Sequence, residues 1–81
     1  MTLEEESASL RIIAQCRDFN LRLAEQQALQ GFRLDDVAIG SVETSFALGL
    51  SLRGEAHAAI SWMRDVLDVM EDALAAKATV Q

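Results

Sequence analysis

Four carboxylates lie close together towards the C-terminal end of the sequence and are its best candidates for chemistry. Spacings of three and four residues place side chains at neighbouring positions on a helix surface. Hard divalent cations such as Mg²⁺ prefer oxygen ligands of this kind. The cluster could therefore hold a metal ion for hydrolysis, and it consists of Asp65, Asp68, Glu71 and Asp72.

The pair Asp65-x-x-Asp68 loosely resembles half of the magnesium site in all-α nucleotide pyrophosphatases of the MazG type. Enzymes of that family hold magnesium with a Glu-Glu-x-x-Glu segment and a later Glu-x-x-Asp segment. The resemblance therefore implies a metal-dependent nucleotide hydrolase of all-α type. The first half of the site is missing here, because Glu4, Glu5 and Glu6 lie at a helix start and lack the third spaced carboxylate. The hydrolase is kept as the alternative function, and the resemblance identifies no family.

The simpler interpretation of the acidic cluster is a solvated helix face. Charges opposite an apolar stripe are usual on a surface helix, so we expect no bound metal or cofactor. Zinc sites need several Cys or His ligands and di-iron bundles need repeated Glu-x-x-His, whereas this chain has one Cys and one His. We expect Cys16 to be an inert core thiol between Ile12 and Phe19, and His57 to be solvated. No catalytic residue is predicted.

The balance of charge argues against nucleic-acid and membrane partners. The 81 residues include 13 Asp and Glu against 7 Lys and Arg, which gives a net charge of −6. Phosphates and anionic headgroups attract clusters of Lys and Arg, and no such cluster is visible. No stretch approaches the roughly 20 apolar residues that span a bilayer. A lone cysteine and an acidic start fit a reducing compartment, so we expect a cytoplasmic protein.

Two glycines divide the chain into three helical segments. Gly31 and Gly54 fall where the helical periodicity breaks, as at helix C-terminal ends. Thr2-Leu-Glu-Glu5 has the form of a capping box for the first helix, and Asp35 is expected to cap the second. No linker is visible, so the chain is predicted to be a single all-α domain. It covers residues 1–81, with helices over about 2–29, 35–52 and 55–78.

The apolar residues cover more helix surface than one small chain can bury. The first helix is apolar over more than half of its circumference, the second nearly all round, and the third along one clean side. The second helix is therefore predicted to be the most buried. Small domains gain extra stability from disulfides, metals or partner chains, and a single cysteine excludes an internal disulfide. A partner chain is the remaining expectation.

The second and third helices carry the candidate interface residues. Small residues at i, i+4 and i+8 of the second helix would let another helix approach closely, either from a second copy or from within the chain. Packing within the chain is slightly favoured. Soft and flat side chains on the third helix could line a groove, although core packing also explains them. The candidates are Ser41, Ser45, Gly49, Phe46, Trp62, Met63 and Met70.

Short turns make successive helices antiparallel, so the predicted fold is a three-helix up-down-up bundle. Two such chains are expected to pair as a homodimer with a shared helical core. The predicted function is a small acidic helical protein–protein interaction module, such as an adaptor, regulator or accessory subunit. Its partner is a second copy or another protein, bound through exposed apolar helix faces.

Overall fold

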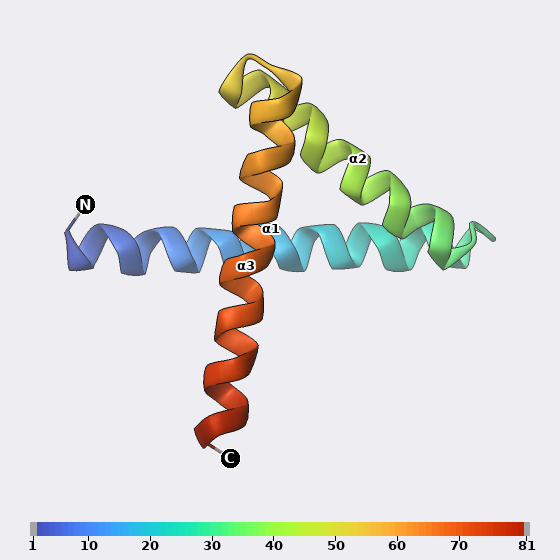
Figure 1. The fold of residues 1–81 in the computed structure, drawn as a ribbon. Coiled ribbons are helices and arrows are strands. Elements are labelled where there is room, and N and C mark those ends of the chain that lie inside the picture. The colour runs from blue at the N-terminus through green and yellow to red at the C-terminus, as the bar shows by residue number, and fades with distance from the viewer. Residues whose placement is uncertain (1, 81) are drawn as a thin grey trace. The chain divides into compact units, whose positions relative to one another are not determined.

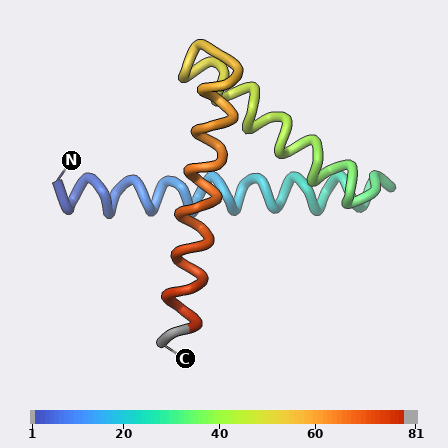
Figure 2. The backbone as a smooth tube through the Cα atoms, in the orientation of Figure 1, coloured from blue at the N-terminus to red at the C-terminus, as the bar shows by residue number. Residues whose placement is uncertain are grey.

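The computed structural model describes residues 2–80, and the side chains of residues 2–78. Within these residues the chain forms three helices and no strand, joined by two short turns (Figure 1; Figure 2). The helices are α1 (Leu3–Leu29), α2 (Leu34–Arg53) and α3 (Ala56–Val80). The all-α prediction is confirmed, and each helix begins within one residue of its expected position.

The start of α1 follows the predicted cap. Thr2 is in an extended conformation, and its hydroxyl oxygen accepts a hydrogen bond from the Glu5 backbone N–H at 3.2 Å. The Thr2 carbonyl accepts from the Glu6 N–H at 3.0 Å. These bonds satisfy groups that a helix start otherwise leaves without partners, and the acidic first turn complements the positive end of the helix dipole.

Both turns depend on a glycine with a positive φ angle. Gly31 has φ of +96° after α1, and Gly54 has φ of +77° after α2. Residues with a Cβ atom adopt this left-handed region only at a cost, so glycine is the default residue there. The Gly31 N–H donates to the Ala28 carbonyl at 3.0 Å, and the Gly54 N–H donates to the Leu50 carbonyl at 2.8 Å. The predicted helix ends are confirmed.

The predicted N-cap of α2 is wrong. The helix begins at Leu34, and its first carbonyl acceptor is Arg33, which binds the Val37 N–H at 3.0 Å. Asp35 lies inside the first turn, where its carboxylate is 3.5 Å from the Arg33 guanidinium. The chain recovers helical geometry directly after the Gly31 turn, so α2 starts before a side-chain cap at position 35 could act.

The start of α3 is capped by Glu55. Its two carboxylate oxygens accept from the His57 N–H at 2.9 Å and from the Ala58 N–H at 3.0 Å. Its carbonyl accepts from the Ala59 N–H at 3.0 Å. Three backbone donors of the first turn are thereby satisfied, and the negative charge lies at the positive end of the helix dipole.

The chain divides into two compact units, which we call unit 1 (Met1–Ile39) and unit 2 (Gly40–Gln81). Unit 1 contains α1 and the first turns of α2, and unit 2 contains the rest of α2 and all of α3. None of the helices among the described residues is both long enough and apolar enough to span a membrane.

Unit 2 is a helical hairpin with a tight contact near its turn, and α2 and α3 diverge from this turn (Figure 1). Gly49 of α2 and Ala59 of α3 are buried, and they are the only buried residues among those described. A Cβ atom placed on Gly49 would lie 2.8 Å from the Trp62 ring and 3.5 Å from the Ala59 Cβ. The absence of a side chain on Gly49 therefore lets Trp62 lie directly against the α2 backbone.

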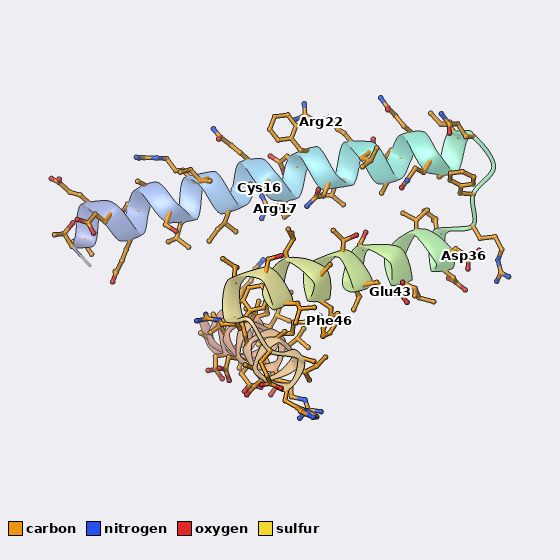
Figure 3. All side chains as sticks on the ribbon, turned by 90° about the horizontal axis from the view of Figure 1, so that it is seen from above. Cys16, Arg17, Arg22, Asp36, Glu43 and Phe46 are labelled. Carbon is orange, nitrogen blue, oxygen red and sulfur yellow. The ribbon has the colours of Figure 1, made fainter. Side chains whose placement is uncertain are left out.

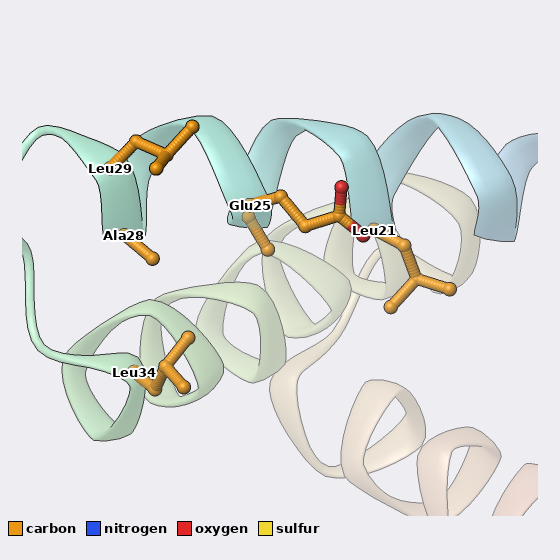
Figure 4. A pocket seen from close by; sticks show the side chains of 6 residues that line it. Leu21, Glu25, Ala28, Leu29 and Leu34 are labelled. Atoms are coloured by element: carbon orange, nitrogen blue, oxygen red, sulfur yellow. The ribbon is translucent and has the colours of Figure 1, made fainter.

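Unit 1 contains no buried residue among the described ones. The C-terminal half of α1 presents Leu21, Ala24 and Ala28 towards Leu34 at the start of α2, and these residues line a shallow groove (Figure 4). Ala24 and Ala28 are half-buried, whereas Leu21 and Leu34 are 55% and 65% exposed. The pairing in unit 1 therefore leaves these large apolar side chains mostly in water.

Two burial predictions fail in the single chain. The second helix was expected to be the most buried, yet its large apolar residues Ile39, Val42 and Leu48 are all more than half exposed. Cys16 was expected in the core, yet its thiol is exposed. In both units the pairing of two helical segments covers an apolar side chain only where the segments are in close contact. A side chain elsewhere on the helix stays in water, and so does one that, like Val42, lines an open groove.

Candidate interaction surface

An apolar groove runs between α2 and α3 in unit 2, and we call it the α2–α3 groove. Its volume is about 270 Å³, at the lower limit of small-molecule pockets. Two of its walls remain largely in water, since Leu67 is 60% and Met70 55% exposed. An open apolar trough of this size suits the side chains of an apposed helix. It is lined by Val42, Ser45, Trp62, Met63, Val66, Leu67 and Met70.

The only hydroxyl in this lining is already satisfied by its own helix. The Ser45 Oγ donates to the Ser41 carbonyl at 3.1 Å, as Thr44 does to Gly40 at 2.9 Å one position earlier. A serine bonded back in this way presents mainly its Cβ atom to the groove. The α2 wall of the groove is therefore narrow and apolar, and the Ser45 hydroxyl needs no hydrogen-bond acceptor from a bound partner.

The structure brings together four of the seven residues predicted for the interface. Ser45, Trp62, Met63 and Met70 all line the α2–α3 groove. Trp62 and Met63 are half-buried, so they form its base and leave Met70 at an open edge. Soft methionine side chains can adapt their shape to an incoming surface.

The other three predicted residues have different surroundings. Gly49 is buried beneath Trp62 of the same chain, so the small-residue strip is used there for packing inside unit 2. Phe46 is half-buried on the side of α2 that faces α3 (Figure 3). Ser41 is exposed and does not line the groove.

Three further lining residues, Val42, Val66 and Leu67, were not among the candidate interface residues. Helical spacing could have identified them, because Val42 precedes Ser45 by three residues and Val66 lies between Met63 and Met70 at intervals of three and four. What the sequence could not show is which side of the nearly all-apolar α2 would turn towards α3.

The acidic residues of α3 do not form a metal centre. Among the described residues, no three Asp, Glu, His or Cys side chains come together where they could hold a metal ion. Asp65 and Asp72 are seven residues apart, which corresponds to about 10 Å along a helix axis. A single straight helix does not bring two carboxylates at this spacing onto one ion, so the metal site of the alternative function stays a prediction from the sequence.

The same acidic residues give the groove a negative border. The segment 60–74 carries Arg64 against four carboxylates, so its net charge is −3. Helical spacing places Asp65 and Asp72 beyond one edge of the apolar side of α3. At the other edge, beyond Leu67, it places Glu71 together with Arg64, so the excess of negative charge lies on the first edge. A docking partner with basic residues beside its apolar stripe would be attracted to this surface.

A second exposed apolar surface follows α1, and we call it the α1 stripe. It comprises Ile12, Cys16, Phe19 and Leu23, spaced at i, i+4, i+7 and i+11 on one side of the helix. Ile12, Phe19 and Leu23 are 59%, 65% and 55% exposed. Arg22 lies beside the stripe, with its guanidinium carbon 4.8 Å from the centre of the Phe19 ring (Figure 3).

Comparison with known proteins adds no assignment. No family model matches the chain, and neither a curated protein nor a solved structure matches it. The two exposed apolar surfaces and their charges are therefore the features of the chain that indicate a function.

Proposed function

We propose that the protein is a small acidic helical interaction module, acting as an adaptor, regulator or accessory subunit that buries its apolar helix faces against another protein chain. The α2–α3 groove carries this proposal. It combines adaptable methionine side chains and a half-buried tryptophan base with exposed aliphatic walls. Hydrophobic grooves of this kind accept amphipathic helices.

The groove is continuous with further apolar surface on α3. Leu74 follows Met70 by one turn on the same side of the helix and is 68% exposed. Complete burial of an aliphatic side chain stabilises a complex by about 1.5 to 3 kcal/mol, so a side chain that is already one-third buried still offers about 1 to 2 kcal/mol. Leu67, Met70 and Leu74 together form a contiguous docking area, and such areas mark interaction sites on soluble proteins.

We propose that the first partner to test is a second copy of the chain. The proposed assembly is a homodimer with a shared helical core. The reason is the size of the chain. A folded chain of 81 residues hides only about 60 to 65% of the surface that its unfolded form exposes, and dimerisation would bury further apolar surface. The proposed compartment is the cytoplasm, because the single thiol of Cys16 is exposed and has no partner cysteine in the chain.

Sedimentation across a wide range of concentrations tests the proposal, with circular dichroism on the same samples. We expect a species heavier than the 8.9 kDa chain that dissociates on dilution. Replacing both Leu67 and Met70 by Asn should return the protein to monomers while helicity is retained, because both side chains are more than half exposed in the single chain. A parent chain that stays at 8.9 kDa throughout, or a variant that associates normally, would contradict the proposal.

A further inference from the structure

The α1 stripe lies on the side of α1 that faces away from the start of α2. At about 100° per residue, the stripe is centred roughly 145° around the helix from the side that bears Leu21, Ala24 and Ala28. That opposite side is the one turned towards Leu34 across the Gly31 turn (Figure 4). The α1 stripe is therefore presented outward from unit 1.

The charges of the α1 stripe and of the α2–α3 groove have opposite signs. The central segment of α1, residues 7–24, carries three arginines and one aspartate, for a net charge of +2, although the chain as a whole is acidic. Helical spacing places Arg11, Arg22 and Asp18 along one edge of the stripe, and the Asp18 carboxylate also lies 3.5 Å from the Arg17 guanidinium. This edge therefore has an excess of one positive charge. The groove segment 60–74 has a net charge of −3.

The two surfaces also match in length and in chemistry. The stripe from Ile12 to Leu23 extends over about 16 Å, and the groove wall from Trp62 to Leu74 over about 18 Å. Both are apolar along their centres, and the basic edge of one could meet the acidic border of the other. Such complementarity orients partners and speeds their encounter.

We infer that the α1 stripe of one chain docks in the α2–α3 groove of a second copy, and that the second copy returns the same contact. This inference rests on the proposed function and names the partner surface. In a dimer with two-fold symmetry this contact occurs twice, so it contributes twice to the stability of the dimer.

Complementation between two variants tests this arrangement. Phe19→Asp places a carboxylate in the stripe, and Met70→Asp places one in the groove. Each variant alone should lose both contacts and sediment as a monomer, with at least a tenfold increase in dissociation constant. An equimolar mixture should regain a dimer, because the intact stripe of one variant fits the intact groove of the other. Leu10→Asp is the matched control, since Leu10 is 66% exposed, like Phe19 at 65%, but lies on another side of α1.

Cross-linking gives a second measurement that does not depend on disruptive variants. Cys16 is the only cysteine and is exposed, so Leu67→Cys creates one further thiol in the groove wall. A short bifunctional thiol reagent, applied to a mixture of ¹⁴N- and ¹⁵N-labelled chains, should join position 16 of one chain to position 67 of another. Links only within one chain, or only between two Cys16 residues, would overturn the inference.

The outcomes separate failure of the inference from failure of the proposed function. If Met70→Asp dissociates the protein but Phe19→Asp does not, the groove is an interface and the α1 stripe is not its occupant. If the mixture of the two variants stays monomeric and no link joins positions 16 and 67 between chains, the inference is overturned. If the parent chain itself never associates, the proposed function fails together with the inference.

Discussion

Units 1 and 2 each join two helical segments through a glycine turn, but among the described residues only unit 2 buries any. In unit 2, Gly49 and Ala59 let the helices approach closely enough for Trp62 to lie against backbone. In unit 1, Leu21 of α1 and Leu34 of α2 line one groove, and both stay more than half exposed. Unit 1 also has small residues at its contact, Ala24 and Ala28, so small residues alone do not produce burial. In unit 2 a large side chain, Trp62, lies directly against the small residue Gly49.

The largest expected effect follows from removing the aromatic ring of unit 2. Complete loss of a buried Trp side chain costs about 3 to 5 kcal/mol, and Trp62 is half-buried, so Trp62→Ala should lower the free energy of unfolding by about 2 kcal/mol. Leu34→Ala in unit 1 should cost less than about 1 kcal/mol, because Leu34 is 65% exposed. Urea denaturation followed by circular dichroism measures both. Equal losses would remove the distinction between the units.

The next effect compares two glycines on the same helix. Gly49→Ala places a Cβ atom 2.8 Å from the Trp62 ring, whereas a Cβ on Gly40 meets nothing within 4 Å. Overpacking costs about 1 to 3 kcal/mol and is partly offset by the better helix propensity of alanine, so a net loss of about 1 kcal/mol is expected for Gly49→Ala.

Gly40→Ala is the matched control for that substitution. It should raise stability by up to about 1 kcal/mol, because the same gain in helix propensity occurs without a clash. Thermal melting resolves the contrast, since 1 kcal/mol corresponds to about 4 to 8 °C in a chain of this size. If both variants melt at a higher temperature than the parent, Trp62 lies farther from Gly49 than the 2.8 Å approach implies.

The smallest expected effect compares the caps of α3 and α1. Glu55→Ala removes two backbone hydrogen bonds one turn before the buried Ala59, so it should cost about 1 kcal/mol of global stability. Thr2→Ala removes one bond at a helix start that holds no buried side chain, and it should cost about half as much. Hydrogen exchange should show local fraying of α1 for Thr2→Ala. Protection of unit 2 that falls equally in both variants would contradict this picture.

Local features of the fold could be predicted from the sequence because they depend on neighbouring residues. The Thr2 cap and the Gly31 and Gly54 turns each involve groups within a few positions of one another. The cap of α2 was mistaken because two acidic residues near a helix start are equally compatible with a cap at Asp35 and with a first turn that begins at Leu34.

The candidate site could be predicted only in part. The third helix has one clean apolar side, and its predicted residues Trp62, Met63 and Met70 do line the groove. The second helix is apolar nearly all round, so periodicity does not show which side meets α3. Gly49 therefore proved to be a packing position inside unit 2, and Val42 was missed.

The sequence by itself determined that the chain is helical, where its helices begin and end to within one or two residues, and that its apolar residues exceed what one small chain can bury. These properties follow from local hydrogen bonding, glycine geometry and composition. Only the tertiary structure decided that Trp62 packs on Gly49, that Cys16 is exposed, and that the acidic residues of α3 border a groove without forming a metal site. Such outcomes depend on which sides of two helices meet, and that choice is made by contacts between residues distant in sequence.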